Sequence, residues 1–176
     1  MKGGPRGRRL LVGGAAALCA IAVVAASSVL FVWPATDRPA AADAVIVLGG
    51  DGHRDATGER LVREGVAPTL AVSVGSPDDP CYRRRVLFTL ICFRPSPFTT
   101  QGEARWIAQN AKAKGWRSIV VVVSDPQATR ARVRIRRCYG GPLQVVGVRL
   151  SVTRTIRDVF YEWGALLKAM TLQRTC

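Results

Sequence analysis

The hydrophobic residues of the chain form one long block near the N-terminus and a series of short runs after it. Residues 10–32 are an apolar block of 23 residues without a charged side chain. At 1.5 Å per residue, a helix of this length crosses a hydrocarbon core about 30 Å thick. The pattern predicts one transmembrane signal-anchor helix over residues 10–32, a linker over residues 33–42 and one globular domain over residues 43–176.

The globular part alternates between strand-like and helical patterns. Continuous apolar runs predict buried parallel strands at residues 44–48, 69–74, 118–123 and 143–148. Helices are expected at residues 54–64, 100–114 and 126–138, and residues 77–97 read as an irregular insertion. Strands that alternate with helices predict a Rossmann-like three-layer α/β/α sandwich with a mainly parallel sheet.

Two helices carry further local signals. Thr100 and Glu103 have the spacing of a capping box, which would begin the second of these helices and account for the Glu103 side chain. A final helix has apolar residues three and four positions apart, and we expect this face to join the core. Its members are Ile156, Val159, Phe160, Trp163, Leu166, Leu167 and Met170.

The charges at the N-terminus predict the orientation of the anchor. Lys2, Arg6, Arg8 and Arg9 precede the apolar block, and residues 1–9 contain no acid. Positive flanks stay in the cytoplasm, so residues 1–9 should be a cytoplasmic tail and the domain should lie outside the membrane. A cleaved signal peptide is the alternative, although the apolar regions of such peptides span only about 7–15 residues.

The predicted anchor changes which anionic partner the positive charge of the chain indicates. The 176 residues include 26 Lys and Arg against 12 Asp and Glu, a formal charge of +14. Without the four basic residues of the tail, 22 basic residues remain against 12 acidic ones. An exported domain does not meet a chromosome, so we expect no nucleic acid but an anionic envelope polymer or lipid-phosphate ligand. The alternative is that arginine is simply frequent here, because the basic residues are scattered rather than clustered.

The cysteines agree with an oxidising compartment. Cys19 lies in the anchor, which leaves four cysteines and three pairings. The spacing favours Cys81–Cys92 and Cys138–Cys176, which would stabilise the fold by about 3 and about 4 kcal/mol. A zinc site is disfavoured, because no C-x-x-C pair exists and His53 is the only histidine.

Most of the candidate chemistry falls at the carboxyl ends of the predicted strands, where α/β sheets bind ligands. Arg54 and Arg130 are guanidinium groups suited to phosphate or carboxylate. A glycine loop beside them can bring backbone N–H groups to an anion, although it is neither G-x-G-x-x-G nor a P-loop. The complete candidate ligand site is Gly49, Gly50, Asp51, Gly52, Arg54, Thr100, Glu103, Ser124, Asp125, Gln127 and Arg130.

Neither a metal nor a cofactor is assigned by this pattern. Asp51, Glu103 and Asp125 could hold a divalent ion, but no ligand spacing demands one. His53 could serve as a base, although a solvated loop histidine is the favoured interpretation.

Two stretches of the domain resemble one known family. ADAVIVLGGDGHRDATGERLVREGVAPTLAVSVG and TTQGEARWIAQNAKAKGWRSIVVVVSDPQATRAR are similar to the two halves of the YdcF/SanA/ElyC-like bacterial proteins, over about residues 43–150. The resemblance implies a Rossmann-like domain, often anchored by an N-terminal membrane helix, with a role in envelope biogenesis or barrier function. Its biochemical activity is poorly defined. The Ala/Arg/Val-rich composition with paired cysteines resembles the actinobacterial branch.

The family pattern maps onto the candidate site with two departures. Its glycine pair and arginine match Gly49, Gly50 and Arg54, and its Thr-x-x-Glu-Ala step begins at Thr100. In the Thr-Ser-x-x-His-x-x-Arg-Ala element, which ends in Arg130 and Ala131, Val123 replaces the hydroxyl residue and Gln127 replaces the histidine. Glutamine does not exchange a proton near neutral pH. The chain is therefore expected to be an envelope enzyme acting on an anionic substrate or, alternatively, a binding or structural module whose chemistry has lapsed.

Overall fold

The computed structural model describes residues 5–50 and 53–176. Its elements are α1 (Pro5–Ser27), the π-helical turn η1 (Ser28–Val32), β1 (Ala44–Val47), α2 (Arg54–Arg63), β2 (Thr69–Ser73), the 3₁₀ turn η2 (Pro80–Arg83), β3 (Thr89–Phe93), α3 (Thr100–Lys114), β4 (Ile119–Ser124), α4 (Asp125–Cys138), β5 (Leu143–Val148) and α5 (Val152–Thr171). Apart from β3 and the turns, the predicted boundaries of the strands and of α2, α3 and α4 agree to within one residue.

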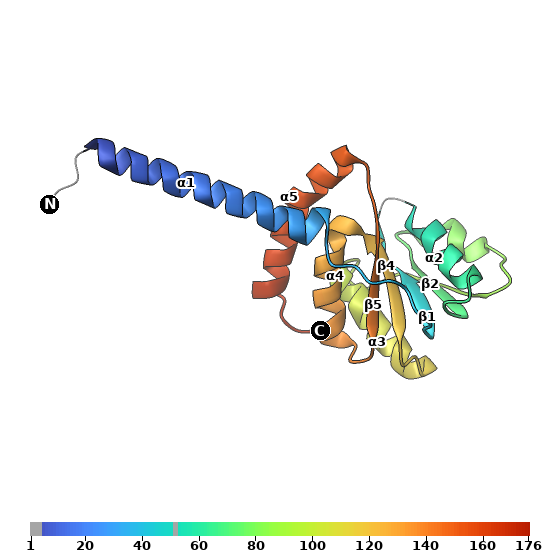
Figure 1. Cartoon of the computed structure of the whole chain (residues 1–176). Helices are drawn as coiled ribbons and strands as arrows, with labels where there is room; N and C mark the ends of the chain where they lie inside the picture. The colour runs from blue at the N-terminus through green and yellow to red at the C-terminus, as the bar shows by residue number, and fades with distance from the viewer. Residues whose placement is uncertain (1–4, 51–52) are drawn as a thin grey trace.

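The domain is built on a five-stranded parallel sheet with the order β3-β2-β1-β4-β5. Figure 1 shows α2 on one side of the sheet and α3 and α4 on the other. Each face buries its own apolar core, because alternate residues of β1 such as Val45 and Ile46 point to opposite faces. The α/β sandwich predicted from the sequence is confirmed.

The fifth strand was missed in the sequence, where residues 77–97 read as irregular. β3 is an edge strand that pairs with β2, and four of its five residues are half-buried or exposed. The crossover that leads to it contains only η2 instead of a full helix. The run Thr89–Phe93 is itself apolar, but no helical pattern precedes it and it lies between segments rich in arginine and proline. It was therefore assigned to the irregular insertion.

The predicted capping box is also wrong. The N-cap of α3 is Thr99, whose hydroxyl accepts a hydrogen bond from the Gly102 N–H at 3.3 Å. A side chain at Gly102 would place its Cβ 1.9 Å from the Pro97 carbonyl oxygen, so glycine allows the preceding loop to lie against the helix. The shift of one position frees Thr100 and Glu103 for contacts elsewhere.

The N-terminal helix is docked against the domain. Val12–Val32 is long and apolar enough to cross a membrane by length and composition, and side chains 12–25 are exposed. Phe31 of η1 is completely buried and packs edge-on against Trp163 of α5, with ring centroids 5.3 Å apart. The Thr129 hydroxyl of α4 donates to the Leu30 carbonyl at 2.6 Å. The helix therefore leaves the domain in a direction fixed by packing (Figure 1).

The segment after η1, residues 33–42, runs along β5. The Asp37 backbone N–H donates to the Val145 carbonyl at 2.8 Å, and the Val145 N–H donates to the Asp37 carboxylate at 2.7 Å. Arg132 of α4 pairs with the same carboxylate at 2.9 Å. These contacts hold residues 33–42 against the sheet edge.

Both predicted disulfides are present. Cys81–Cys92 joins η2 to β3, and Cys138–Cys176 joins the end of α4 to the last residue. Two such bonds are typical of a domain in an oxidising compartment.

The core role predicted for the α5 face is wrong for most of its members. Ile156, Phe160, Leu167 and Met170 are exposed, whereas Glu162 and Ala169 are the buried residues of the helix. α5 packs against α4 and η1 instead of against the sheet. Because α4 already covers the sheet, only a narrow strip of α5 can be buried.

Candidate functional site

The candidate site lies where the chain direction in the sheet reverses. β1 and β4 are neighbours, but the chain continues from β1 toward one edge of the sheet and from β4 toward the other. Such a switch point leaves a crevice at the carboxyl ends of the two strands. A cavity of about 580 Å³ occupies this position, between the loop after β1 and the first turns of α3 and α4, and α5 forms its outer wall.

Arg54 and Gln127 join the loop after β1 to α4. The Arg54 Nη1 donates to the Gly49 carbonyl at 2.9 Å and to the Gln127 side-chain oxygen at 2.8 Å. Gly50 has φ +130°, and a Cβ there would lie 2.0 Å from the Arg54 Nη2. Glycine is therefore required both by the backbone conformation and by the guanidinium packed against it.

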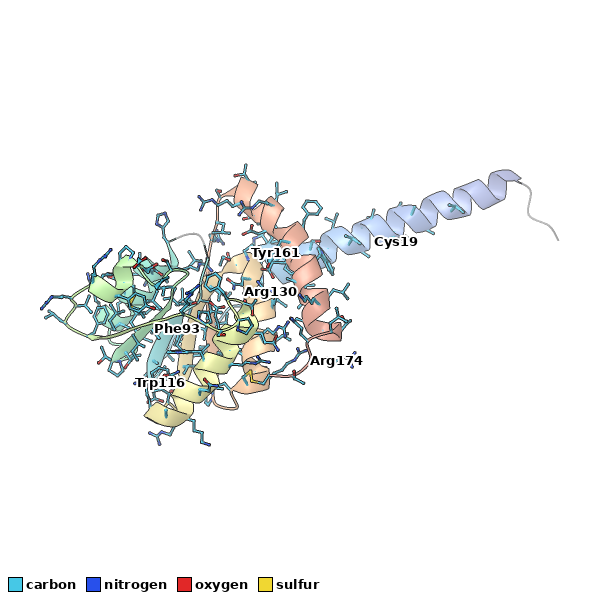
Figure 2. The ribbon with its side chains drawn as sticks, turned by 180° about the vertical axis from the view of Figure 1, so that it is seen from behind. Cys19, Phe93, Trp116, Arg130, Tyr161 and Arg174 are labelled. Carbon is cyan, nitrogen blue, oxygen red and sulfur yellow. A yellow bond between two sulfur atoms is a disulfide. The ribbon has the colours of Figure 1, made fainter. Side chains whose placement is uncertain are left out.

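Arg130 is the second guanidinium of the cavity. Its Nη1 donates to the Thr100 hydroxyl at 2.7 Å, and its Nε and Nη2 donate to the two Glu162 oxygens at 2.6 and 2.7 Å. Figure 2 shows Arg130 beside Tyr161 where α4 meets α5, and the guanidinium carbon is 5.9 Å from the ring centroid. Burial alone would lower the pKa of Arg130, but the hydrogen bonds and charge of Glu162 outweigh it and raise that pKa.

Thr100 and Gln127 connect the two arginines. The Gln127 amide donates to the Thr100 hydroxyl at 3.3 Å, and this hydroxyl also accepts from Arg130. Arg54 is bound to the other end of the same amide. The two guanidinium groups are thus held in one hydrogen-bonded chain across the floor of the cavity.

Glu103 is the buried acid of this floor. Its carboxylate accepts the Gly49 backbone N–H at 2.6 Å, so it fixes the loop after β1 instead of capping its own helix. Burial raises the pKa of Glu103, and the hydrogen bond from Gly49 and the charges of Arg130 and Arg54 only partly oppose this shift. Glu103 consequently gives up its proton less readily than an ordinary glutamate.

The structure brings together most of the residues predicted for the site. The cavity is lined by Gly49, Gly50, Arg54, Thr100, Glu103, Ser124, Gln127 and Arg130. Asp125 does not line it, because its carboxylate points to β5, where a Cβ at Gly147 would lie 2.0 Å from its Oδ1. His53 is exposed outside the cavity, and Asp51 and Gly52 lie outside the described residues.

Sequence reasoning missed one wall of the cavity. Its additional lining residues are Phe98, Arg157, Asp158, Tyr161 and Glu162, four of which belong to α5. The spacing of Asp158 and Glu162 could have indicated this wall. The two acids are four residues apart and therefore share one side of the final helix, which was assigned to the core from its apolar residues alone. Nothing in the sequence indicates which residue would pair with Asp158 or Glu162.

The site combines two arginines, one amide and two buried acids, Glu103 and Glu162. Gln127 occupies the centre of the network and does not titrate, and Glu103 is the acid closest to the glycine loop. Within the described part of the chain, no group of three or more His, Cys, Asp or Glu side chains could hold a metal ion.

No protein-family model matches the sequence, and no match to a curated protein was found.

Proposed function

We propose that this protein is a membrane-anchored, YdcF-like envelope protein whose domain lies outside the membrane and binds an anionic, phosphate-bearing ligand in the cavity at the carboxyl ends of β1 and β4. The observation that carries the proposal is the pair Arg54 and Arg130, joined through Gln127 and Thr100 on the floor of that cavity. An ordered pair of guanidinium groups at the switch point of a parallel sheet suits a phosphate group.

The helix termini around the cavity favour an anion. The three arginines that line it, Arg54, Arg130 and Arg157, balance the carboxyl groups of Glu103, Asp158 and Glu162. The N-termini of α3 and α4 add partial positive charge on the same side. The three Arg130 hydrogen bonds use three of its five N–H hydrogens, so two have no partner among the described residues.

The cellular part of the proposal rests on the N-terminus and on the resemblance. Lys2, Arg6, Arg8 and Arg9 favour a cytoplasmic N-terminus, and the two disulfides favour an exported domain. The likeness of residues 43–150 to the YdcF/SanA/ElyC-like family suggests a role in envelope biogenesis or barrier function.

A second candidate is a binding or structural module without catalysis, favoured by Gln127. This amide accepts a hydrogen bond from Arg54 and donates one to Thr100. It holds the two arginines but cannot transfer a proton, so binding can persist where turnover has been lost.

Calorimetric titration of the full chain in detergent with inorganic phosphate, pyrophosphate and glycerol 1-phosphate tests the proposal. We expect saturable binding of at least one probe, weakened at least tenfold in the double variant Arg130→Met/Glu162→Gln, because a hydrogen bond to a charged group is worth about 1.5–3 kcal/mol. The double variant removes the ion pair without leaving a buried charge. Arg136→Met removes one charge from an exposed position of the same helix and is the matched control.

The outcomes separate the two candidates. Equal affinity of the double variant and the wild type refutes the anion site. Binding that survives in Gln127→His, together with no release of phosphate from glycerol 1-phosphate by the wild type, supports the non-catalytic module. Release of phosphate by the wild type supports an enzyme.

A further inference from the structure

α5 has three distinct faces. One face points to the domain and carries Thr155, Asp158, Glu162, Ala165 and Ala169, which are buried or half-buried. A second, apolar face is exposed on the same helix. The third face is basic and polar. A helix at the edge of a soluble domain usually exposes only its polar face, so the second face needs an explanation.

The exposed apolar face is continuous along the whole helix. Its residues follow one another at intervals of three and four, as required for a single stripe. They are Val152, Ile156, Phe160, Trp163, Leu167 and Met170; Trp163 is half-buried, and the others are 50–77% exposed. An exposed row of large apolar side chains indicates a surface that binds another protein or a membrane.

The middle of the apolar stripe lies where the anchor meets the domain. The Trp163 indole N–H donates to the Ser27 hydroxyl at 2.9 Å, and the Trp163 ring packs against Phe31. α5 runs transverse to α1 at the base of that helix (Figures 1 and 2). If α1 crosses a bilayer, α5 lies along the bilayer surface.

The length of the free part of the anchor places that surface close to α5. The apolar block starts at residue 10, and side chains 12–25 are exposed, so about 16 residues precede the docked part. They span about 24 Å, less than the roughly 30 Å of a hydrocarbon core. The bilayer must therefore reach the docked turn. Trp33, 69% exposed at the end of η1, has the amphipathic ring typical of this depth.

Basic residues flank the apolar stripe. Arg154, Arg157 and Lys168 are exposed on the third face of α5, and Arg174 follows the helix. An apolar stripe bordered by Arg and Lys is the pattern of a helix that lies in the interface of a membrane containing anionic lipids.

We propose that α5 is an interfacial helix, which lies on the bilayer surface with its apolar stripe among the acyl chains and its basic face at the anionic headgroups. This inference rests on the proposed membrane anchorage. Because Arg157, Asp158, Tyr161 and Glu162 line the cavity from the same helix, the proposal also places the cavity at headgroup level. A ligand attached to a lipid could then enter without leaving the membrane.

Spin labels in vesicles of phosphatidylcholine and phosphatidylglycerol test this placement. The full chain is labelled at Phe160→Cys or Leu167→Cys in a Cys19→Ser background with both disulfides intact, and Arg63→Cys on α2 is the exposed control. Wild-type Cys19, the free cysteine of α1, reports on the anchor itself. The measured quantity is the ratio of collisions with oxygen to collisions with a water-soluble nickel chelate.

We expect this ratio to be several-fold higher at positions 160 and 167 than at position 63, because oxygen concentrates in the acyl chains. Ratios at 160 and 167 equal to that at 63, with a lipid-type ratio at Cys19, overturn the interfacial helix while leaving the anchor intact. Labels at 160 that are shielded from both reagents and coupled to each other indicate a second copy of the chain and also overturn it. A water-type ratio at Cys19 overturns the anchor and this proposal together.

Discussion

Replacing Glu162 by glutamine should destabilise the domain much more than an ordinary surface substitution. Glu162 is buried on α5, and its two carboxylate oxygens accept hydrogen bonds from the Nε and Nη2 of Arg130. The side chains of Arg130 and Glu162 are 12% and 5% exposed. The ion pair therefore connects α4 and α5 in a place where water reaches neither group freely.

The expected magnitude follows from this burial. Removing one partner of a buried pair leaves an uncompensated charge and costs about 3–5 kcal/mol. The pair borders the cavity, so some water can compensate, and we expect about 3 kcal/mol for Glu162→Gln and for Arg130→Met. The double variant leaves no buried charge and should cost about 1 kcal/mol, far below the sum of the single variants.

Unfolding of the four proteins in the same detergent, followed by tryptophan fluorescence, measures this cycle. For a domain of this size each single variant should lower the Tm by about 10 °C. The exposed variant Arg136→Met controls for the loss of one arginine from α4. Single variants that each cost less than 1 kcal/mol, or costs that add in the double variant, would refute the argument that the pair is buried and coupled.

Three further predictions concern the floor of the cavity and the docked turn η1. Glu103→Gln should flatten the dependence of the free energy of unfolding on pH. Because the pKa of Glu103 is raised, the folded protein binds this proton more tightly than the unfolded chain, so the wild type loses stability relative to the variant as the pH rises from 4.5, the ordinary pKa, to the folded-state pKa. Urea titrations between pH 4 and pH 8 measure this difference. Gly50→Ala should cost about 2 kcal/mol through its positive φ and the displaced guanidinium, whereas Gly65→Ala, with positive φ but open space, should cost about 1 kcal/mol in the same assay. Phe31→Ala should lower the free energy of unfolding by about 3 kcal/mol, and an unchanged value would show that η1 does not pack on the domain.

The parts of the fold that could be predicted are those with strong local patterns. The valine-rich run that became β4 is buried on both faces, and a continuous apolar run has one simple interpretation. β3 was missed because it is a short edge strand preceded by a crossover without a helix. The α5 face was misassigned because an amphipathic pattern reports that a helix has an apolar side, but not what covers it.

Only the part of the candidate site that follows the strands of the sheet could be predicted from the sequence. Residues that follow β1 and β4 share one edge by topology, so Arg54 and Gln127 could be placed there from the sequence. Their hydrogen bond, and the use of Glu103 to fix Gly49, depend on rotamers and on a cap shifted by one residue. Glu162 enters the site through the packing of α5 on α4, a tertiary contact with no sequence pattern of its own.

Hydrogen exchange of the full chain, with and without millimolar pyrophosphate, tests the anion site most directly because it locates binding as well as detecting it. The account predicts slower exchange in the loop after β1 and in the first turns of α2, α3 and α4, with the last turn of α2 unchanged. The same addition should protect these segments much less in Arg130→Met/Glu162→Gln. Unchanged exchange around the cavity in the wild type, or protection confined to another surface, would contradict it.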